Sequence, residues 1–473
     1  MSHEATPEEN EHFRDAISLV DDKTGNREWV YPKKPKGKLT TIRTWFSFSL
    51  MALMFSGPFI KVDGHPFILL NILQRKFIIF GFPFWPQDMP LFALLMMTFV
   101  VFVVVFTVLF GRVWCGWACP QTIFMEMLFR KIEYLIEGDY TQQIKLDDSP
   151  WNGNKIFKKT LKHTLFFILS VAIANIFLGY IIGIDEVSKL ITDGPSENLG
   201  EFFALIIFSS VFYFVFAKFR EIVCIVICPY GRLQGLMLDN NSILVTYDFV
   251  RGEPRGHIKK ASDQTHLGDC IDCKRCVHVC PTGIDIRNGS QLECVNCTAC
   301  IDECDDVMNK VSRPTGLIRY ASQDEIVNKT KNGLTFRSGA YVVILALLLS
   351  ALVYFLVSRK SIDTTLLRTP GMLFQQQDSD RVSNMYNFVI VNKTFDSQKI
   401  MVKVSEPANA EIKMIDRDFN GMELKEDDLI KSSFFIIMKQ KEITQNNTNV
   451  VIDIYSNGIL KDKIKTNFVG PVK

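Results

Sequence analysis

The amino-acid sequence predicts a multi-span α-helical membrane protein that also carries a small cysteine-rich domain and a C-terminal β-sandwich. Three observations support this fold class. Five stretches approach or reach the length and apolar character of a bilayer-crossing helix, and eight of the twelve cysteines lie within one short segment. The region after the last apolar stretch alternates β-branched runs with turn residues, as short strands do.

The charge balance excludes one broad class of function. The chain has 473 residues, of which 53 are Lys or Arg and 51 are Asp or Glu, so its formal net charge is only +2. A protein that binds nucleic acid through its surface needs a large basic face, and the sequence offers no such excess. We therefore expect no nucleic-acid partner.

Five transmembrane helices are expected, since about 20 mostly apolar residues cross the hydrocarbon core of a bilayer. A further apolar stretch, Pro66–Pro86, holds Arg75 and Lys76 at its centre, where a charge is costly. We expect an interfacial loop or hairpin there. The five spans run from about Ile42–Ile60, Met89–Phe110, Leu161–Ile184, Phe202–Phe219 and Gly339–Val357.

Positively charged residues predict the orientation of these spans. Lys and Arg are frequent before the first span, between the second and third, and after the fourth, whereas the loop Asp185–Gly200 has only Lys189. By the positive-inside rule the N-terminus is cytoplasmic, and five crossings place the C-terminus outside. The polar start, Met1–Arg43, predicts no cleaved signal peptide.

These features divide the chain into five parts. The last part has strand-like segments such as NMYNFVIVNKTF and NVVIDIYS and no cysteine, so we expect a β-sandwich with an interaction or support role. The parts are a cytoplasmic N-terminal segment (1–41), a four-helix membrane region (42–230), the cytoplasmic cysteine-rich domain (231–338), the fifth transmembrane helix (339–358) and the β-sandwich (359–473).

Eight cysteines form two runs of the pattern C-x2-C-x2-C-x3-C, the spacing of bacterial ferredoxins with two [4Fe-4S] clusters. The runs lie on the reducing cytoplasmic side, where disulfides are rare. Structural zinc is the alternative, because C-x2-C pairs also suit zinc. In two-cluster ferredoxins the fourth cysteine of each run ligates the other cluster. The expected ligands are Cys270, Cys273, Cys276 and Cys304 for one cluster, and Cys294, Cys297, Cys300 and Cys280 for the other.

The other four cysteines form a duplicated C-x3-C-P motif, Cys115 with Cys119 and Cys224 with Cys228. Each motif follows the cytoplasmic end of a predicted span. Proline favours the first position of a helix, so Cys119 and Cys228 are expected to cap the helices that follow. Four soft thiolates at one depth suit Cu(I), zinc or a further iron–sulfur cluster. Buried small side chains at helix ends are the plainer alternative.

The segment Gln121–Gly138 has apolar residues at helical spacing along one face and charged residues elsewhere. This pattern predicts a helix that lies on the cytoplasmic membrane interface. Trp114 and Trp117, which flank Cys115, are expected to be interfacial anchors.

Several segments together resemble one known family. They are QRKFIIFGFPFWPQD (Gln74–Asp88), VWCGWACPQTIFMEMLFRKIEYLIEGD (Val113–Asp139), CPYGRLQ (Cys228–Gln234), YDFVRGEPRG (Tyr247–Gly256) and CPTGIDIRNGSQLECVNCTACIDECDDVM (Cys280–Met308). In these segments the chain resembles the cytochrome c oxidase accessory proteins known as CcoG, FixG or RdxA. The resemblance covers nearly the whole chain.

The resemblance implies a multi-pass protein of the bacterial inner membrane with five spans, a two-cluster ferredoxin-like domain and a periplasmic Ig-like C-terminal domain. It implies a role in assembling a cbb-type cytochrome c oxidase, as a cupric reductase that makes Cu(I) on the cytoplasmic side. The implied partners are oxidase assembly factors, copper-handling proteins and an unidentified electron donor. A second copy of the chain, forming a homodimer, is a further alternative. The candidate catalytic residues and ligands of copper or another cofactor are Cys115, Cys119, Cys224 and Cys228.

Two other functions fit the same residues. The first is an electron conduit that exchanges electrons between the iron–sulfur clusters and the quinone pool. The second is a non-enzymatic scaffold for oxidase assembly that works chiefly through the external sandwich. The three hypotheses differ in whether the function of the protein depends on copper, on quinone or on neither.

Overall fold

The computed structural model divides the chain into two compact units. The first comprises Met1–Phe59 and Leu95–Ser350, and the second comprises Ile60–Leu94 and Ala351–Lys473. We call them the cysteine unit and the sandwich unit. The described residues are 27–471 without 28, 73–75, 86–87, 194–198, 258–266, 330–335, 370, 372, 379, 415–421, 426–427 and 444. Most of the predicted N-terminal segment and the charged centre Arg75 lie outside this range.

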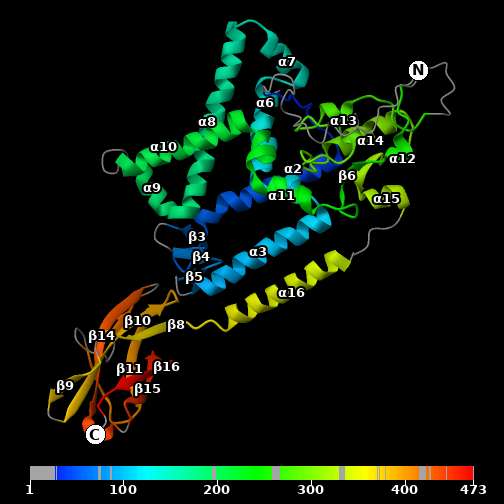
Figure 1. Ribbon diagram of the computed structural model, residues 1–473. Coiled ribbons are helices and arrows are strands. Elements are labelled where there is room, and N and C mark those ends of the chain that lie inside the picture. Colours follow the sequence, from blue (N-terminus) through cyan, green and yellow to red (C-terminus); the bar gives the residue numbers. More distant parts are fainter. Residues whose placement is uncertain are drawn as a thin grey trace. The chain divides into compact units, whose positions relative to one another are not determined.

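Four helices are long and apolar enough to cross a membrane, among the residues described (Figure 1). They confirm the second to fifth predicted stretches. The first predicted stretch is helical too, as α2 (Lys38–Ser56), but its polar first turns keep it out of this group, and its crossing stays a prediction. The four are α3 (Met89–Phe110), α8 (Gly153–Ile182), α10 with its π-helical extension (Leu199–Phe219), and α16 (Phe336–Val357).

The helix predicted to lie on the membrane interface is instead part of the core. It runs from α5 (Pro120–Ile123) through a π-helical turn, Phe124–Phe129, into α6 (Arg130–Ile136). The ring of Phe129 is fully buried and stacks on Phe216 at 4.5 Å between centroids. The surface prediction was therefore wrong, because long-range packing covers more than one face of this helix. Only Leu135, at 84% exposure, keeps the expected position.

Buried charges join this helix to its neighbours. Arg130 is 1% exposed and pairs with Glu126 at 3.1 Å and with Glu221. Glu133 is 4% exposed and pairs with Arg220, which has a positive φ of 50° at the end of the α10 extension. A buried charge left without its partner is costly, so this network fixes the chain just before the second C-x3-C-P motif.

The cysteine-rich region folds between two short antiparallel strands, β6 (Leu244–Tyr247) and β7 (Ile318–Ala321). Its apolar core mixes Tyr247, Ile301 and Leu317 with several of the cysteines themselves. The remaining helices of the unit are α4 (Val113–Trp117), α7 (Tyr140–Asp148), α9 (Ile184–Asp193), α11 (Pro229–Met237), α12 (Phe249–Gly252), α13 (Arg275–His278), α14 (Ala299–Lys310) and α15 (Gln323–Asn328).

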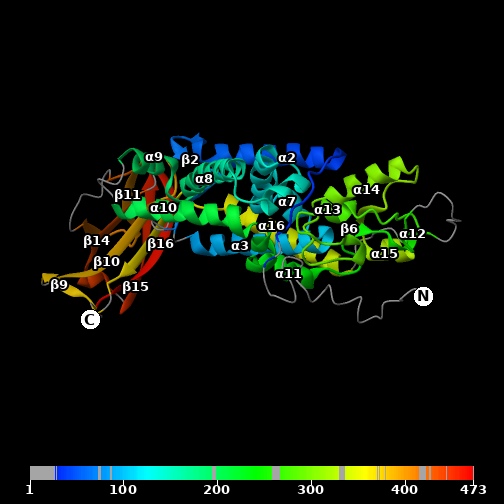
Figure 2. The same ribbon diagram turned by 90° about the horizontal axis from the view of Figure 1, so that it is seen from above.

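The predicted β-sandwich is confirmed in the sandwich unit, where two antiparallel sheets share one core (Figure 2). The first sheet has the order β12-β14-β10-β8 with β9 paired to β10, and the second has the order β13-β11-β15-β16. The strands are β8 (Ile362–Arg368), β9 (Gln375–Asp378), β10 (Arg381–Asn392), β11 (Gln398–Glu406), β12 (Glu411–Met414), β13 (Met422–Leu424), β14 (Leu429–Lys439), β15 (Asn447–Ser456) and β16 (Ile459–Val469).

The stretch Pro66–Pro86 is the expected hairpin, not a sixth span. Its strands β3 (Ile68–Asn71), β4 (Lys76–Ile79) and β5 (Phe82–Phe84) form an antiparallel meander after a small pair, β1 (Lys61–Val62) and β2 (His65–Pro66).

Asp88, which follows this meander, ties it to the sandwich. Its carboxylate is 8% exposed and accepts hydrogen bonds from Lys393 and Arg359, both at 2.6 Å. Removing the carboxylate would leave a buried cation without this counter-charge.

We predict that Asp88→Asn destabilises the sandwich unit by about 3–5 kcal/mol, the usual cost of removing one partner of a buried ion pair. This loss of stability can be measured by heating the detergent-solubilised protein and using proteolytic cleavage of the sandwich unit as the readout of unfolding. Glu186→Gln, which breaks the exposed pair Lys189–Glu186, is the matched control and should change nothing measurable. Equal stability of Asp88→Asn and wild type would contradict the role given to Asp88.

The same ion pair predicts a pH dependence. Burial alone would raise the pKa of Asp88, but hydrogen bonds from Lys393 and Arg359 hold it below its usual value. The stabilisation is therefore complete above the pKa of an unfolded aspartate and is lost as the pH falls through the lowered folded pKa. An acid titration of unfolding should show this loss in wild type and not in Asp88→Asn.

Candidate metal centres

The first cysteine run curls around a small cavity. Cys270, Cys273 and Cys276 line this cavity, and Cys304 reaches it from helix α14 of the second run. Tyr247 forms part of the wall. The structure thus brings together the four residues that the spacing assigned to one cluster.

The second run encloses a second cavity in the same way. Cys294, Cys297 and Cys300 line it, and Cys280 comes from the first run, just after α13. Cys276 lines both cavities, so the two are immediate neighbours. The fourth cysteine is thus exchanged between the runs in both directions.

Both loops repeat one unusual backbone pattern. In the first run the residues on either side of Cys273, Asp272 and Lys274, have φ values of 51° and 54°. In the second run the equivalent residues, Asn296 and Thr298, have φ values of 55° and 68°. Left-handed residues other than glycine are uncommon. Their recurrence at matched positions explains how each short loop turns its three thiols toward one cavity.

The chemistry of these thiols fits an iron–sulfur cluster. Burial raises the pKa of the Cys276 and Cys294 thiols to about 12, so they stay protonated at neutral pH unless a metal replaces the proton. The sulfur of Cys280 accepts hydrogen bonds from the backbone N–H groups of Thr282, Gly283 and Ile284. Hydrogen bonds to sulfur are one of the protein's means of setting a cluster potential.

The arrangement of the thiols also bears on the choice between iron–sulfur clusters and structural zinc. Within the described part of the chain, no three His, Cys, Asp or Glu side chains converge closely enough to hold a single metal ion. The same holds for the thiols of the two C-x3-C-P motifs. What favours iron–sulfur clusters over zinc is the tandem spacing, with four cysteines lining each cavity and the fourth exchanged between the runs.

The two C-x3-C-P motifs share their local structure. Cys119 is the N-cap of α5 and Cys228 is the N-cap of α11, and in each case the proline occupies the first turn. Their ψ angles of 123° and 112° are extended, as the residue before proline requires. The predicted capping positions are confirmed, although neither thiol bonds to the helix N-terminus.

The four thiols of these motifs lie near one another. Cys119 and Cys228 are close enough to Cys115, and the other three cysteines to Cys224, to contribute to the raised pKa of these two thiols. The Sγ of Cys115 also donates to Oε1 of Gln234 at 3.5 Å. Burial raises the pKa of Cys115 to about 11 and that of Cys224 to about 12. Sequence reasoning had left open whether the two pairs meet.

Gly116 brings this thiol group against the second cysteine run. A Cβ at Gly116 would lie 2.4 Å from the carbonyl oxygen of Val295 and 2.8 Å from that of Asn296. Both atoms are backbone, which cannot move aside cheaply, so glycine is required. Cys115 packs in one apolar cluster with Val295 and Cys297. The C-x3-C-P thiol group therefore adjoins the second cavity.

Two aromatic residues and an arginine strengthen this contact. The indole N–H of Trp117 donates to the hydroxyl of Tyr320 at 3.1 Å, and that hydroxyl donates to the carbonyl of Asn296 at 3.2 Å. Nε of Arg43 donates to the carbonyl of Gly116 at 2.8 Å. Sequence reasoning missed all three roles. The position of Trp117 between two cysteines was the only available signal, and it had been assigned to the membrane interface.

Three protein families match parts of the chain. Residues 219–323 match a family described as "4Fe-4S dicluster domain", and residues 92–136 match one described as "4Fe-4S binding domain". Residues 352–471 match "IG-like fold at C-terminal of FixG, putative oxidoreductase". The second of these ranges contains Cys115 and Cys119 and none of the eight ferredoxin-type cysteines.

Full-length relatives agree with these matches. The nitrogen fixation protein FixG of Rhizobium meliloti is 38% identical over 63% of this chain and 57% of its own length. Proteins RdxA and RdxB of Cereibacter sphaeroides are 31% and 32% identical, over 80% and 81% of this chain and 82% and 83% of their own lengths. A solved FixG-related protein from Vibrio parahaemolyticus covers 24% of this chain and 100% of its own at 12% identity, but its TM-score of 0.22 supports no argument.

We predict that Gly116→Ala forces α4 away from the second cysteine run. Overpacking of this kind costs about 1–3 kcal/mol. The iron–sulfur absorbance of the purified protein should therefore be lost at a lower temperature than in wild type.

Gly153→Ala is the matched control, because a Cβ at Gly153 meets no atom within 4 Å. It should leave the melting temperature unchanged or slightly raised. Identical melting of Gly116→Ala and wild type would show that the contact at Val295 is not tight.

Proposed function

Because this chain belongs to the protein family of FixG and RdxA, we propose that it reduces Cu(II) to Cu(I) for the assembly of a cbb-type cytochrome c oxidase. It is an iron–sulfur redox protein with membrane helices and a C-terminal Ig-like domain. The observation that carries the proposal is the contact at Gly116. At this contact Cys115, one of the four soft thiols, packs against residues that line the cavity of the second cysteine run.

Eight cysteines hold the resident cofactors in this proposal. When bound, two [4Fe-4S] clusters supply single electrons. The chain's own contribution is to place the two cavities side by side, with Cys276 on the wall of both, and to shield them with apolar residues. One cluster would be held by Cys270, Cys273, Cys276 and Cys304, and the other by Cys294, Cys297, Cys300 and Cys280, the cysteines that line the two cavities.

Copper is the substrate, and a pair of thiols of the C-x3-C-P thiol group is its site. Each Cu(II) ion accepts one electron and becomes Cu(I), and each protonated thiol that binds copper releases its proton to solvent. Thiolate ligands favour Cu(I) over harder ions, which means that binding and reduction pull in the same direction. Gln234 and Thr122 orient the thiols through hydrogen bonds to Cys115 and Cys224.

The proposed membrane topology puts this chemistry in the cytoplasm. Five helices, α2 with the four apolar ones, cross the bacterial inner membrane, with the N-terminus inside and the sandwich in the periplasm. The distribution of Lys and Arg supports this orientation. Copper-handling proteins and oxidase assembly factors are the expected partners.

The test is copper reduction by the protein itself. Anaerobic holoprotein is reduced, freed of excess reductant, and mixed with Cu(II) and a Cu(I)-specific chelator. Wild type should form Cu(I), whereas Cys115→Ser combined with Cys224→Ser should slow its formation at least tenfold. The double variant is expected to be slow because it lacks two of the soft thiol ligands at the proposed copper site.

Iron content and the electron paramagnetic resonance spectrum of the clusters serve as controls, and both should match wild type in the double variant. Cys294→Ser is the comparison variant and should lose iron instead. Unchanged Cu(I) formation in the double variant would exclude these thiols as the copper site. Intact oxidase maturation in Cys270→Ser would favour the scaffold alternative.

A further inference from the structure

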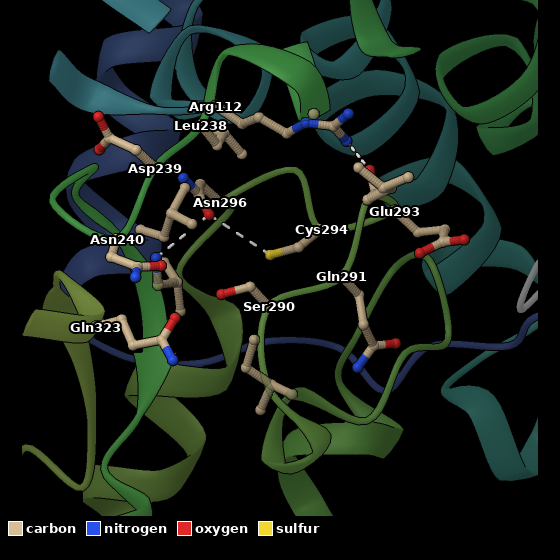
Figure 3. Close-up of a pocket in the computed structure, with 15 residues that line it drawn as sticks. Arg112, Leu238, Asp239, Asn240, Ser290, Gln291, Glu293, Cys294, Asn296 and Gln323 are labelled. Atoms are coloured by element: carbon tan, nitrogen blue, oxygen red, sulfur yellow. Dashed lines mark hydrogen bonds between the residues drawn. The ribbon is translucent and has the colours of Figure 1, made fainter. Parts of the chain in front are cut away.

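An open cavity of about 310 Å³ lies beside Cys294, outside the two cysteine cavities and the C-x3-C-P thiol group. Figure 3 shows the side chains of Asn240, Asn296 and Gln323 on one side of the cavity and those of Gln291 and Glu293 on the other, with Cys294 between them. Small-molecule sites typically measure roughly 300–1,000 Å³. The cavity is thus large enough for one ring-sized ligand in contact with a proposed cluster ligand.

Two candidate membrane helices end at this cavity. Gly111 directly follows α3, and a Cβ there would meet the side chain of Leu244, a lining residue, at 2.4 Å. Asp239, another lining residue, lies 3.8 Å from Arg337 in the first turn of α16. The cavity therefore lies at the ends of two apolar helices, and a ligand dissolved in the membrane that these helices would cross would have a short path to it.

The lining combines an apolar wall with hydrogen-bonding groups, of which Arg112, Asp239 and Glu293 are ionisable and the others uncharged. Leu238, Leu244 and Leu292 supply apolar surface, and the amides of Asn240 and Gln323 supply donors. An apolar wall with a few hydrogen-bond donors fits a flat ring that carries carbonyl groups.

One lining side chain is incompletely satisfied. Asn296 is 1% exposed, and its carboxamide oxygen accepts from the backbone N–H of Val245 at 3.3 Å and from the thiol of Cys294 at 3.5 Å. Its amide nitrogen has no partner among the described residues. A buried donor without an acceptor is costly, and a ligand carbonyl would satisfy it.

We propose that this cavity binds the head ring of a membrane quinol, which is the electron donor of the protein. The proposal rests on the proposed copper reduction for its electron acceptor. The quinol is oxidised to the quinone, two Cu(II) ions become two Cu(I) ions, and two protons leave to solvent through the open side of the cavity. Asn240, Asn296 and Gln323 hold the ring beside Cys294.

Quinone binding to the anaerobic holoprotein tests the site directly. Isothermal titration calorimetry with a short-chain ubiquinone analogue should find one site per chain. Ser290→Phe, at an exposed position of the rim, should weaken binding at least tenfold by filling the cavity, and Gln323→Leu should weaken it several-fold. Both variants should keep the wild-type iron content.

Ser188→Phe, an exposed serine on α9 away from the cavity, is the matched control and should bind like wild type. Equal quinone affinity in Ser290→Phe and wild type would overturn the proposal. Displacement of the quinone by flavin mononucleotide at lower concentration would also overturn it, because the donor ring would then come from a soluble source.

A second readout separates this site from the copper site. Ser290→Phe protein that has been reduced chemically should form Cu(I) at the wild-type rate, while quinol-driven Cu(I) formation should fall at least tenfold. Loss of Cu(I) formation from chemically reduced wild type would contradict the copper proposal and leave the quinol site standing.

Discussion

The close approach of Gly116 to the backbone of Val295 and Asn296 is the constraint on which the redox architecture depends. No side chain fits at this point, so the first C-x3-C-P motif and the second cysteine run meet at backbone distance. Trp117, Tyr320 and Arg43 then add hydrogen bonds around the same contact. The C-x3-C-P thiol group and a ferredoxin-type loop, far apart in sequence, thereby become neighbours.

Buried ion pairs elsewhere in the cysteine unit stabilise the elements that form this contact. Arg130, with its buried partners Glu126 and Glu221, fixes the helix that follows the first motif and the chain that precedes the second. Removal of Arg130 would leave its two acidic partners largely buried without this counter-charge, so this region has few alternative packings. The Ig-like domain is anchored within its own unit by Asp88, Lys393 and Arg359.

Local patterns could be predicted from the sequence, and long-range contacts could not. The cysteine spacing predicted which four thiols line each cavity, and Pro120 and Pro229 predicted the caps at Cys119 and Cys228, since these features depend on a few adjacent residues. The helix after Cys119 was assigned to the membrane surface because its pattern is amphipathic. Its burial depends on Phe166 and Phe216, which are distant in sequence, and no local pattern contains that information.

Single-turnover kinetics would test the central claim most directly. Reduced protein, free of other reductants, is mixed rapidly with Cu(II), and the absorbance of the clusters is followed together with the formation of Cu(I). We expect Cu(I) to appear at the rate at which the clusters are oxidised, with one Cu(I) for each cluster that was reduced. Formation of Cu(I) while the clusters stay reduced, or oxidation of the clusters without Cu(I), would contradict the account.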